Sequence, residues 1–589
     1  MNFFKSFLAS VLGTVVALIF VGLLLIMSVA GIATAVASEE AIAVDVSENS
    51  LLELDLDRPM FDNVGATQDF EEALGLGEDV LKFYDVVLAI RKAAKDDKIK
   101  GIDLKTMSPN MGWSQAQSIR KALEEFKAAG KFIYAFGDYF SQKGYYLASV
   151  SDSIFLHPMG GMEFKGLAAE VLFYKDFQEE YGFKMEVVRH GKYKSAVEPY
   201  LEDKMSEANR TQITSLLNSV WESASTAIAA GRGLTMAGLD EIAHGLKASL
   251  PQQAQENGLI DALIYENDYE HRLKSALNLE EDDRLKTVDL KQLLAGNSLV
   301  KKGVRERIAV IYAQGPVLYG EGSENIIGQK VFLEAIEEAV KNRRVKAIVL
   351  RIDSPGGSAL SSDIIWDALM KAKKEKPLVV SMGNVAASGG YYLAVAGDEI
   401  YANDMTITGS IGVFATVPNI KGFTDNIGIN VQHVETHKNA LGYSVFKAPS
   451  GDFRASIKDG IEQVYDTFKQ RVAAGRDLSL EEVEAIAQGR VWTGRQALEN
   501  GLVDGLGGMD QALEAAARLA QIEEYNLSSY PKIEPEFEDF LSAMGPFSKI
   551  EEKLLAHYPK EINLFLTTLS RQEQRAKVQL RLPYSVEIK

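Results

Sequence analysis

The stretch GDYFSQKGYYLA at residues 137–148 recurs as GNVAASGGYYLA at residues 383–394, shifted by 246 positions. Around these stretches the two halves of the chain align without a gap for about a hundred residues, and the pairing resumes after a small shift. The duplication therefore covers about residues 50–265 and 305–510. A repeat of this length predicts two domains with the same fold.

The differences between the two copies carry the functional information. Four positions hold a reactive or small residue in one copy and a different residue in the other. These positions are Lys194 against Ala440, Gly356-Gly357 against Asn110-Met111, and Ser388 against Gln142. Since each copy lacks what the other keeps, an active site built from these residues must draw on both copies.

Apolar runs of strand length alternate with segments of helical periodicity in both halves. Such alternation predicts an α/β fold with parallel sheets flanked by helices. In sheets of this kind, functional loops follow the carboxyl ends of the strands. The expected strands lie at residues 51–56, 101–105, 132–136, 308–312, 347–352 and 378–382, and the expected helices at 115–129, 331–340, 361–374 and 388–396.

The N-terminus contains a membrane-spanning pattern. Residues 7–37 are mostly apolar and carry no charge, and they exceed the ~20 residues that cross a bilayer as a helix. A secretory signal has an apolar region of only about 7–15 residues, so an uncleaved anchor is favoured, although Ala35-Val-Ala37 resembles a cleavage site. Lys5 before the run, and Glu39 and Glu40 after it, predict a cytoplasmic N-terminus with the rest of the chain across the membrane.

We therefore divide the chain into five parts. The parts are a cytoplasmic N-terminus at 1–6, a transmembrane anchor at 7–37, an N-terminal repeat at 50–295, a C-terminal repeat at 305–520, and a C-terminal arm at 521–589 whose sequence has no counterpart in the first half.

Composition excludes several function classes. A net charge of −19 without a long basic run argues against a nucleic-acid partner. The absence of cysteine excludes disulfides, thiolate metal sites and a cysteine nucleophile. Neither an HExxH nor a CxxC motif is present, so the sequence predicts no metal and no cofactor.

Two loops of the second half offer the chemistry of acyl transfer. The glycine amides of Gly356 and Gly357 can stabilise an oxygen that becomes negative, an effect of about 3–4 kcal/mol per donor. Ser388 precedes a predicted helix and is bordered by small residues, and the amide of Gly389 supplies a second donor. Ser388 could instead be a helix cap. The first copy keeps Gly144 and both following tyrosines but not this serine, which favours a nucleophile.

A serine nucleophile needs a base, and none of the seven histidines lies in a loop typical of a catalytic histidine. His433 lies in an expected strand at residues 431–435 and His437 follows it, and both are interpreted as surface or core residues rather than as a base or a metal pair. A lysine can act as the base if burial keeps it neutral. Lys194 follows an expected strand at residues 185–189 and faces an alanine in the other copy. Lys192 faces another lysine and is the second choice.

These motifs resemble the signal peptide peptidase A family of Ser/Lys peptidases in its long, duplicated bacterial form. The resemblance runs from the anchor to about residue 520. The motifs that carry it are YKSAVEP at residues 193–199, DSPGG at 353–357, ASGGY at 387–391 and TGSIG at 408–412.

The resemblance implies tandem crotonase-like, ClpP-related domains in a membrane-bound serine endopeptidase. Ser388 would be the nucleophile and Lys194 the base, with Gly389, Gly356 and Gly357 forming the oxyanion hole. Ser410 would orient the lysine.

The family further implies a homotetramer in the bacterial inner membrane, with its catalytic part on the periplasmic side, that cleaves remnant signal peptides and other hydrophobic peptides. Two other functions stay open: an acyl-CoA enzyme of the crotonase type, and a membrane scaffold without catalysis.

Overall fold

The computed structural model describes residues 13–14, 20, 46–65, 80–295, 300–532 and 579–581. Within these ranges, no helix is long and apolar enough to span a bilayer. The anchor expected at residues 7–37 lies outside the described residues, apart from three isolated positions.

Two parallel sheets with the same strand order form the centres of the two repeats. This arrangement confirms the predicted parallel sheets and the duplication. The first sheet runs β8 (Ala262–Leu263), β6 (Ser153–Met162), β5 (Phe132–Phe140), β4 (Ile99–Leu104), β1 (Ser50–Leu54) and β9 (Thr287–Val288), and the second runs β20 (Gly505–Leu506), β16 (Glu399–Ala402), β15 (Leu378–Ala387), β13 (Val345–Ser354), β10 (Arg307–Gln314) and β21 (Asn526–Tyr530).

The second sheet has two additions. β17 (Ile407–Gly409) continues the parallel pairing beside the end of β15, and β19 (Val491–Thr493) pairs antiparallel with β17. β21 falls within the region expected to be an arm, and it forms the edge of this sheet as β9 does in the first. The central strands are apolar on both faces because helices cover both sides.

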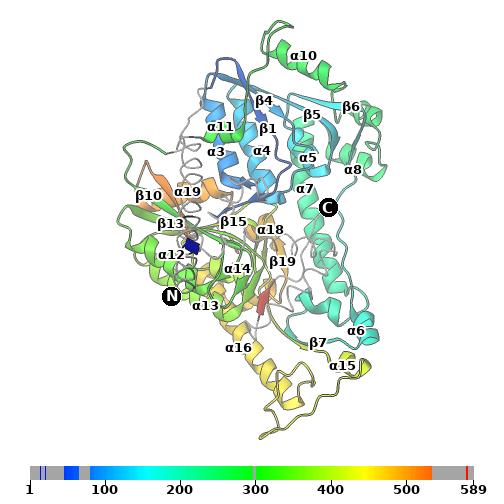
Figure 1. Cartoon of the computed structure of the whole chain (residues 1–589), viewed down its shortest axis with the longest axis vertical. Helices are drawn as coiled ribbons and strands as arrows, with labels where there is room; N and C mark the ends of the chain where they lie inside the picture. Colours follow the sequence, from blue (N-terminus) through cyan, green and yellow to red (C-terminus); the bar gives the residue numbers. More distant parts are fainter. Residues whose placement is uncertain are drawn as a thin grey trace, which may run out of the picture.

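The helices also correspond between the repeats (Figure 1). In the first repeat they are α3 (Phe83–Lys95), α4 (Trp113–Ala128), α5 (Gln142–Ala148), α7 (Glu207–Arg232), α8 (Met236–His244), α9 (Pro251–Glu256) and α10 (Glu266–Ala276). Their counterparts in the second repeat are α12 (Gln329–Lys341), α13 (Ala359–Lys373), α14 (Gly389–Ala394), α16 (Gly451–Arg476), α17 (Leu480–Ile486), α18 (Gly494–Glu499) and α19 (Met509–Ala520).

One hydrophobic core continues across both repeats. α19 of the second repeat buries Met509, Leu513 and Ala516 in the cluster that holds the core of the first repeat, including Ile90 of α3 and Leu123 of α4. Figure 1 shows α19 between the second sheet and the helices of the first repeat. The two repeats are therefore packed as one body, which fixes side chains of one repeat against the other.

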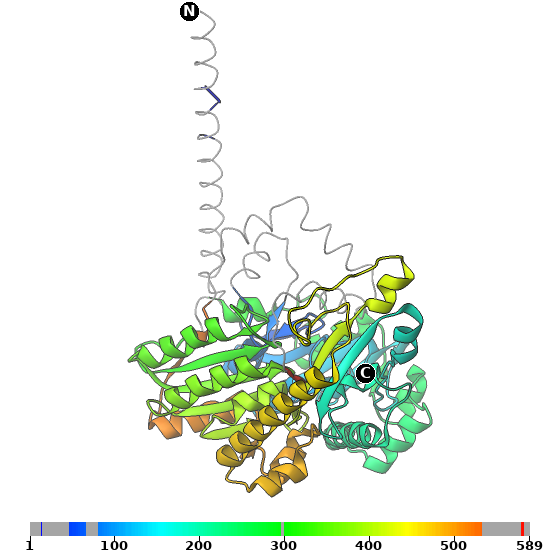
Figure 2. The same cartoon turned by 90° about the horizontal axis from the view of Figure 1, so that it is seen from below.

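A third sheet joins the repeats at the lower end of the molecule (Figures 1 and 2). β7 (Lys184–His190) leaves the first repeat and pairs antiparallel with β18 (Val413–Asn419) of the second. The sheet continues through β22 (Gln579–Arg581) and β14 (Gly356–Ser358) to β11 (Val317–Leu318) and β12 (Ile327–Gly328).

The strand expected at residues 431–435, the counterpart of β7, is wrong: this segment is irregular. A strand needs a neighbour for its backbone groups. The counterpart of β18 in the first repeat, residues 167–173, forms no strand either. The repeats therefore share a single β7–β18 pair.

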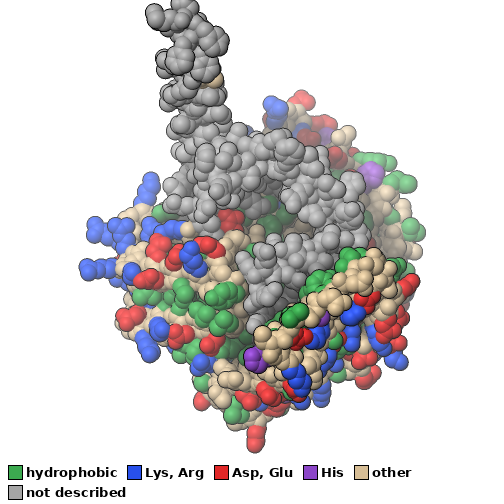
Figure 3. Space-filling model, turned by 60° about the horizontal axis from the view of Figure 1, so that its bottom comes forward, with side chains coloured by type: hydrophobic (Ala, Val, Ile, Leu, Met, Phe, Trp, Pro, Cys, Tyr) green, Lys and Arg blue, Asp and Glu red, His purple; other side chains and the backbone are tan. Residues whose placement is uncertain are grey.

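Elsewhere on the surface, acidic and basic side chains are interspersed over the face in Figure 3.

Candidate active site

Ser388 lies between the end of β15 and the first residue of α14, in an unusual backbone conformation. Its φ is 56° and its ψ is −114°, a region that only glycine adopts without strain. Although Ser388 occupies the cap position of α14, its side chain makes no cap hydrogen bond, and its amide donates to Gly409 O over 2.8 Å. The Ser388 hydroxyl therefore does not act as a helix cap.

β7 delivers Lys194 from the first repeat to this position in the second. The chain leaves β7 at His190, and the Tyr193 amide then donates to Gln488 O over 3.0 Å. Gly489 allows the close approach, because a Cβ at this residue would lie 2.7 Å from Lys194 N and its φ is +81°. No sequence pattern indicates this role of Gly489, since the contact joins distant segments.

The amine of Lys194 is buried among hydroxyl and carbonyl oxygens. Lys194 Nζ lies 2.9 Å from Ser388 Oγ, 3.0 Å from Ser410 Oγ and 3.2 Å from Ser410 O. All three residues have no exposed surface. A neutral amine has two hydrogens and one lone pair. Donation to the two Ser410 oxygens therefore leaves the lone pair for the Ser388 hydroxyl.

Burial lowers the pKa of Lys194 well below 10.5, because the charged form is poorly solvated there. Within the described residues no carboxylate pairs with this amine, so no counter-charge offsets the cost of burying the charged form. Lys192, the second choice, is exposed and lies over the Tyr193 ring. His433 and His437 are also exposed, on the irregular segment that replaces the expected strand.

The predicted oxyanion glycines lie side by side. A Cβ added to Gly389 would lie 3.0 Å from Gly357 N and 3.2 Å from Gly356 Cα. A side chain at Gly357 would collide with the main chain of Val317 in β11. The Gly356 amide already donates to Ser354 Oγ over 3.1 Å. Of the two loop glycines, Gly357 is therefore the better placed to bind an oxyanion together with Gly389.

Comparison with known proteins assigns the chain to a family. The model of Peptidase family S49 matches the chain twice, at residues 125–280 and 370–523, once in each repeat. The chain belongs to this family. It is 33% identical to Protease 4 of Haemophilus influenzae over 491 residues, which cover 80% of the chain and 79% of that relative.

Two further relatives of this S49 peptidase agree. Protease 4 of Salmonella typhi is 35% identical over 462 residues, covering 76% of the chain and 73% of the relative. The chloroplastic serine protease SPPA of Arabidopsis thaliana is 31% identical over 468 residues, covering 77% and 68%. The protein is therefore a serine peptidase, and the resemblance seen in its sequence is confirmed.

A strand from the C-terminal region lies beside the glycine loop of the peptidase. β22 pairs antiparallel with β14, with Leu580 opposite Gly357 and Arg581 opposite Gly356, and Gln579 also faces Phe414 of β18. A three-residue strand therefore fills the space between an edge of the glycine loop and an edge of the β18–β7 pair. Sequence reasoning missed this contact, although apolar and polar residues alternate at residues 578–582 (VQLRL), a period typical of a strand.

The backbone strain at Ser388 leads to a prediction on stability. We expect Ser388→Gly to be more stable than Ser388→Ala by about 1–2 kcal/mol, because glycine adopts positive φ without cost. Neither variant has the hydroxyl, so the comparison isolates the backbone. Urea unfolding of both variants measures the difference. Equal midpoints and slopes would show that Ser388 is not strained.

Proposed function

We propose that Ser388 is the nucleophile and Lys194 the general base of this serine peptidase. The observation that carries the proposal is the 2.9 Å distance between the two side-chain termini, with the amine buried. Ser410 accepts the hydrogens of the neutral amine and so orients its lone pair. A burial-lowered pKa provides the neutral form that a base requires at working pH.

In the proposed reaction, Ser388 Oγ attacks the peptide carbonyl carbon while its proton passes to Lys194 Nζ. The carbonyl oxygen becomes negative and accepts hydrogen bonds from the amides of Gly389 and Gly357. Lys194 then returns the proton to the leaving amine as the C–N bond breaks, which leaves an acyl-enzyme. Water, deprotonated by the same amine, attacks the ester and releases the second product.

A fluorophosphonate probe tests the assignment, since it forms a covalent adduct only with an activated serine. We expect the adduct to map to Ser388 by peptide mass spectrometry and to vanish in Ser388→Ala. Ser141→Ala is the matched control, because Ser141 lies in the corresponding loop of the first repeat, where it caps α5. An adduct on another serine would contradict the proposal.

We further propose that the substrate binds as a strand in the position of β22. Sheet edges commonly bind extended peptides through their main chain. The slot between β14 and β18 offers an edge on each side. It also adjoins the glycine loop, where the scissile carbonyl must lie. The family resemblance supports remnant signal peptides and other hydrophobic peptides as substrates.

A chain ending at Lys532 is expected to bind peptide substrates more tightly than the full chain. Removing β22 frees the slot, and a tethered competitor acts at an effective concentration near the millimolar range. We expect KM to fall several-fold with kcat unchanged. A synthetic peptide of residues 576–583, AKVQLRLP, should then inhibit the shortened chain competitively. Unchanged KM and no inhibition would place the substrate elsewhere.

The remaining features of the proposed function rest on the sequence. They comprise the anchor at residues 7–37, a single pass through the bacterial inner membrane with a periplasmic catalytic part, a homotetramer, and the division into repeats at 50–295 and 305–520 that supply the lysine and the serine. The family assignment removes the support for an acyl-CoA enzyme or a scaffold without catalysis.

A further inference from the structure

β15, the strand that leads to Ser388, is interrupted by a bulge. Along the β13–β15 pair, Ile352 lies opposite Met382 and Ser354 opposite Ala386. The segment 383–385 of β15 therefore faces the single residue Asp353 of β13. A bulge removes backbone groups from the sheet ladder and re-aims the strand beyond it. Here the strand beyond the bulge ends at the nucleophile.

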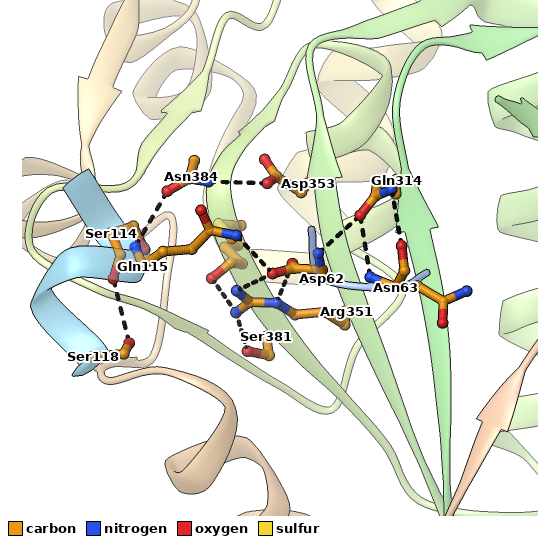
Figure 4. A network of polar contacts seen from close by, with 12 residues as sticks. Asp62, Asn63, Ser114, Gln115, Ser118, Gln314, Arg351, Asp353, Ser381 and Asn384 are labelled. Carbon is orange, nitrogen blue, oxygen red and sulfur yellow. Dashed lines mark hydrogen bonds and ion pairs between the residues drawn. The ribbon is translucent and has the colours of Figure 1, made fainter. Parts of the chain in front are cut away.

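The carboxylate of Asp353 binds two groups of the bulge. Its Oδ1 accepts the Val385 amide over 2.9 Å, and its Oδ2 accepts Asn384 Nδ2 over 3.1 Å. The Asn384 side chain in turn accepts the amide of Gln115, on α4 of the first repeat, over 3.2 Å (Figure 4). Asp353 therefore joins the end of β13 to the bulge of β15.

The contact between Asp353 and the bulge lies close in sequence to both parts of the proposed active site, the glycine loop and the nucleophile. Asp353 stands three residues before Gly356, and Val385 stands three residues before Ser388. A shift of the bulge against β13 therefore moves the nucleophile against the glycine loop.

Comparison of the repeats separates this aspartate from those that the fold requires. At the start of β15, Asp398 accepts the Leu378 amide over 2.8 Å, and its counterpart Asp152 accepts the Ile133 amide over 2.9 Å. Both repeats keep an aspartate that binds an amide at the start of this strand, one aligned position later in the first repeat. The counterpart of Asp353 is Met107, in the repeat without the nucleophile. The fold therefore forms without a carboxylate at this position.

Charged and titratable groups from three elements surround Asp353. Asp62 of the first repeat comes within reach, since a Cβ on Gly383 would contact both carboxylates. Arg351 of β13 binds Asp62 and lies near Asp353, and Tyr312 of β10 lies beside this pair. Burial and, next, the Asp62 charge raise the pKa of Asp353 to about 7, against the opposing effect of Arg351. Its ionisation therefore changes near neutral pH.

We propose that Asp353 is a positioning residue for peptide hydrolysis: its ionised carboxylate holds the bulge at residues 383–385 and so sets Ser388 against the Gly356–Gly357 loop. The inference rests on the proposed function of Ser388. Protonation replaces an acceptor by a donor that faces the Asn384 amide, so the bulge loses one of its two fixed contacts.

The test compares Asp353→Asn with the wild type. We expect kcat to fall about 10- to 100-fold, the range for a misplacement near 1 Å, with KM changed less than about 3-fold. Over about the first 10- to 100-fold of loss, the wild-type kcat should fall on the acid side with a slope above one, because protonation of the Asp353 carboxylate adds to protonation of the Lys194 amine. In Asp353→Asn the slope should approach one.

Asn384→Ala provides a second readout if Asp353→Asn does not fold. The Asn384 hydrogen bond lowers the pKa of Asp353, whereas the Asp62 charge raises it. Asn384→Ala should therefore move the acid limb of kcat to higher pH, and Asp62→Asn should move it to lower pH. A merely structural role predicts no such opposite shifts.

Asp398→Asn is the matched control, since it perturbs the other end of the same strand. We expect it to change the thermal midpoint without changing the slope of the acid limb. Wild-type kcat and a wild-type acid limb in Asp353→Asn would overturn the inference, as would equal acid limbs in Asn384→Ala and Asp62→Asn. Failure of the proposed function is distinguishable, because the wild type would then not be labelled at Ser388.

Discussion

Replacing Lys194 by methionine is expected to lower kcat/KM for peptide hydrolysis at pH 7.5 by about 10²- to 10⁴-fold, the usual contribution of a positioned base. Methionine fills similar space in the fully buried site but cannot accept the Ser388 proton. The fluorophosphonate labelling rate should fall in parallel. Lys192→Met is the control, because that neighbouring lysine is exposed, and it should retain wild-type kinetics.

The same substitution is expected to stabilise the folded protein. Burial lowers the pKa of Lys194 below 10.5, so the folded state binds fewer protons than the unfolded state between the two pKa values. Wild-type stability therefore falls as the pH drops from about 10.5 towards the lowered pKa. Lys194→Met removes this cost, and its advantage in urea unfolding should grow as the pH is lowered. Full activity of Lys194→Met at pH 7.5 would show that another group is the base.

The activity of the wild type should show the matching pH dependence. The neutral amine is the active form, so kcat/KM should rise with pH through the lowered pKa of Lys194 and then level off. Labelling and peptide hydrolysis both require the neutral Lys194 amine to accept the proton of the Ser388 hydroxyl. The labelling rate and kcat/KM should therefore share the same acid limb.

Much of the fold and the pair of candidate side chains could be predicted because the sequence is duplicated. Each repeat serves as a control for the other, which singled out Lys194 and Ser388 among many lysines and serines. The structure places their termini 2.9 Å apart. Alternating apolar segments likewise predicted the parallel sheets, since buried strands and amphipathic helices differ in period.

Other features depend on contacts that no local pattern encodes. Ser388 adopts its positive φ between the bulge of β15 and the start of α14. The Gly356 amide is occupied by Ser354, a contact within the loop that spacing cannot show. Residues 431–435 are expected to form a strand, but a strand also needs a partner, and the first repeat provides none. β22 likewise forms only against edges supplied by distant segments.

Comparing the repeats could not predict the buried ion pair that Asp62 forms between them, since Asp62 lies in a short segment with no repeated motif. Asp62 inserts beneath β13, where its oxygens lie 2.6 and 3.2 Å from Arg351 Nε and Nη2, and both side chains are 2% exposed. Arg351 also donates to Ser381 Oγ and Met382 O, and Gln115 donates to Asp62 (Figure 4). The pair therefore ties the first repeat to the strands that carry the candidate site.

We expect Asp62→Ala to lower the free energy of unfolding by about 3–5 kcal/mol, because it leaves the Arg351 guanidinium buried without a counter-charge. Urea unfolding at pH 7.5 measures the loss. Asp367→Ala on α13 is the control: its pair with Lys371 is exposed on both sides, and such pairs contribute about 0–1 kcal/mol. A loss for Asp62→Ala no larger than the control would show that the ion pair does not hold the repeats together.

A double variant separates the charge from the contact. Replacing both partners with apolar residues of similar size, as Asp62→Leu with Arg351→Met, removes the unpaired charge, and such replacements are often neutral. The double variant should therefore recover most of the stability that Asp62→Ala loses, while Arg351→Met alone leaves Asp62 buried and unpaired. If the double variant were as unstable as either single change, packing rather than charge would account for the loss, and the bulge of β15 would have to be held by Asp353 and Asn384 without support from the pair beneath them.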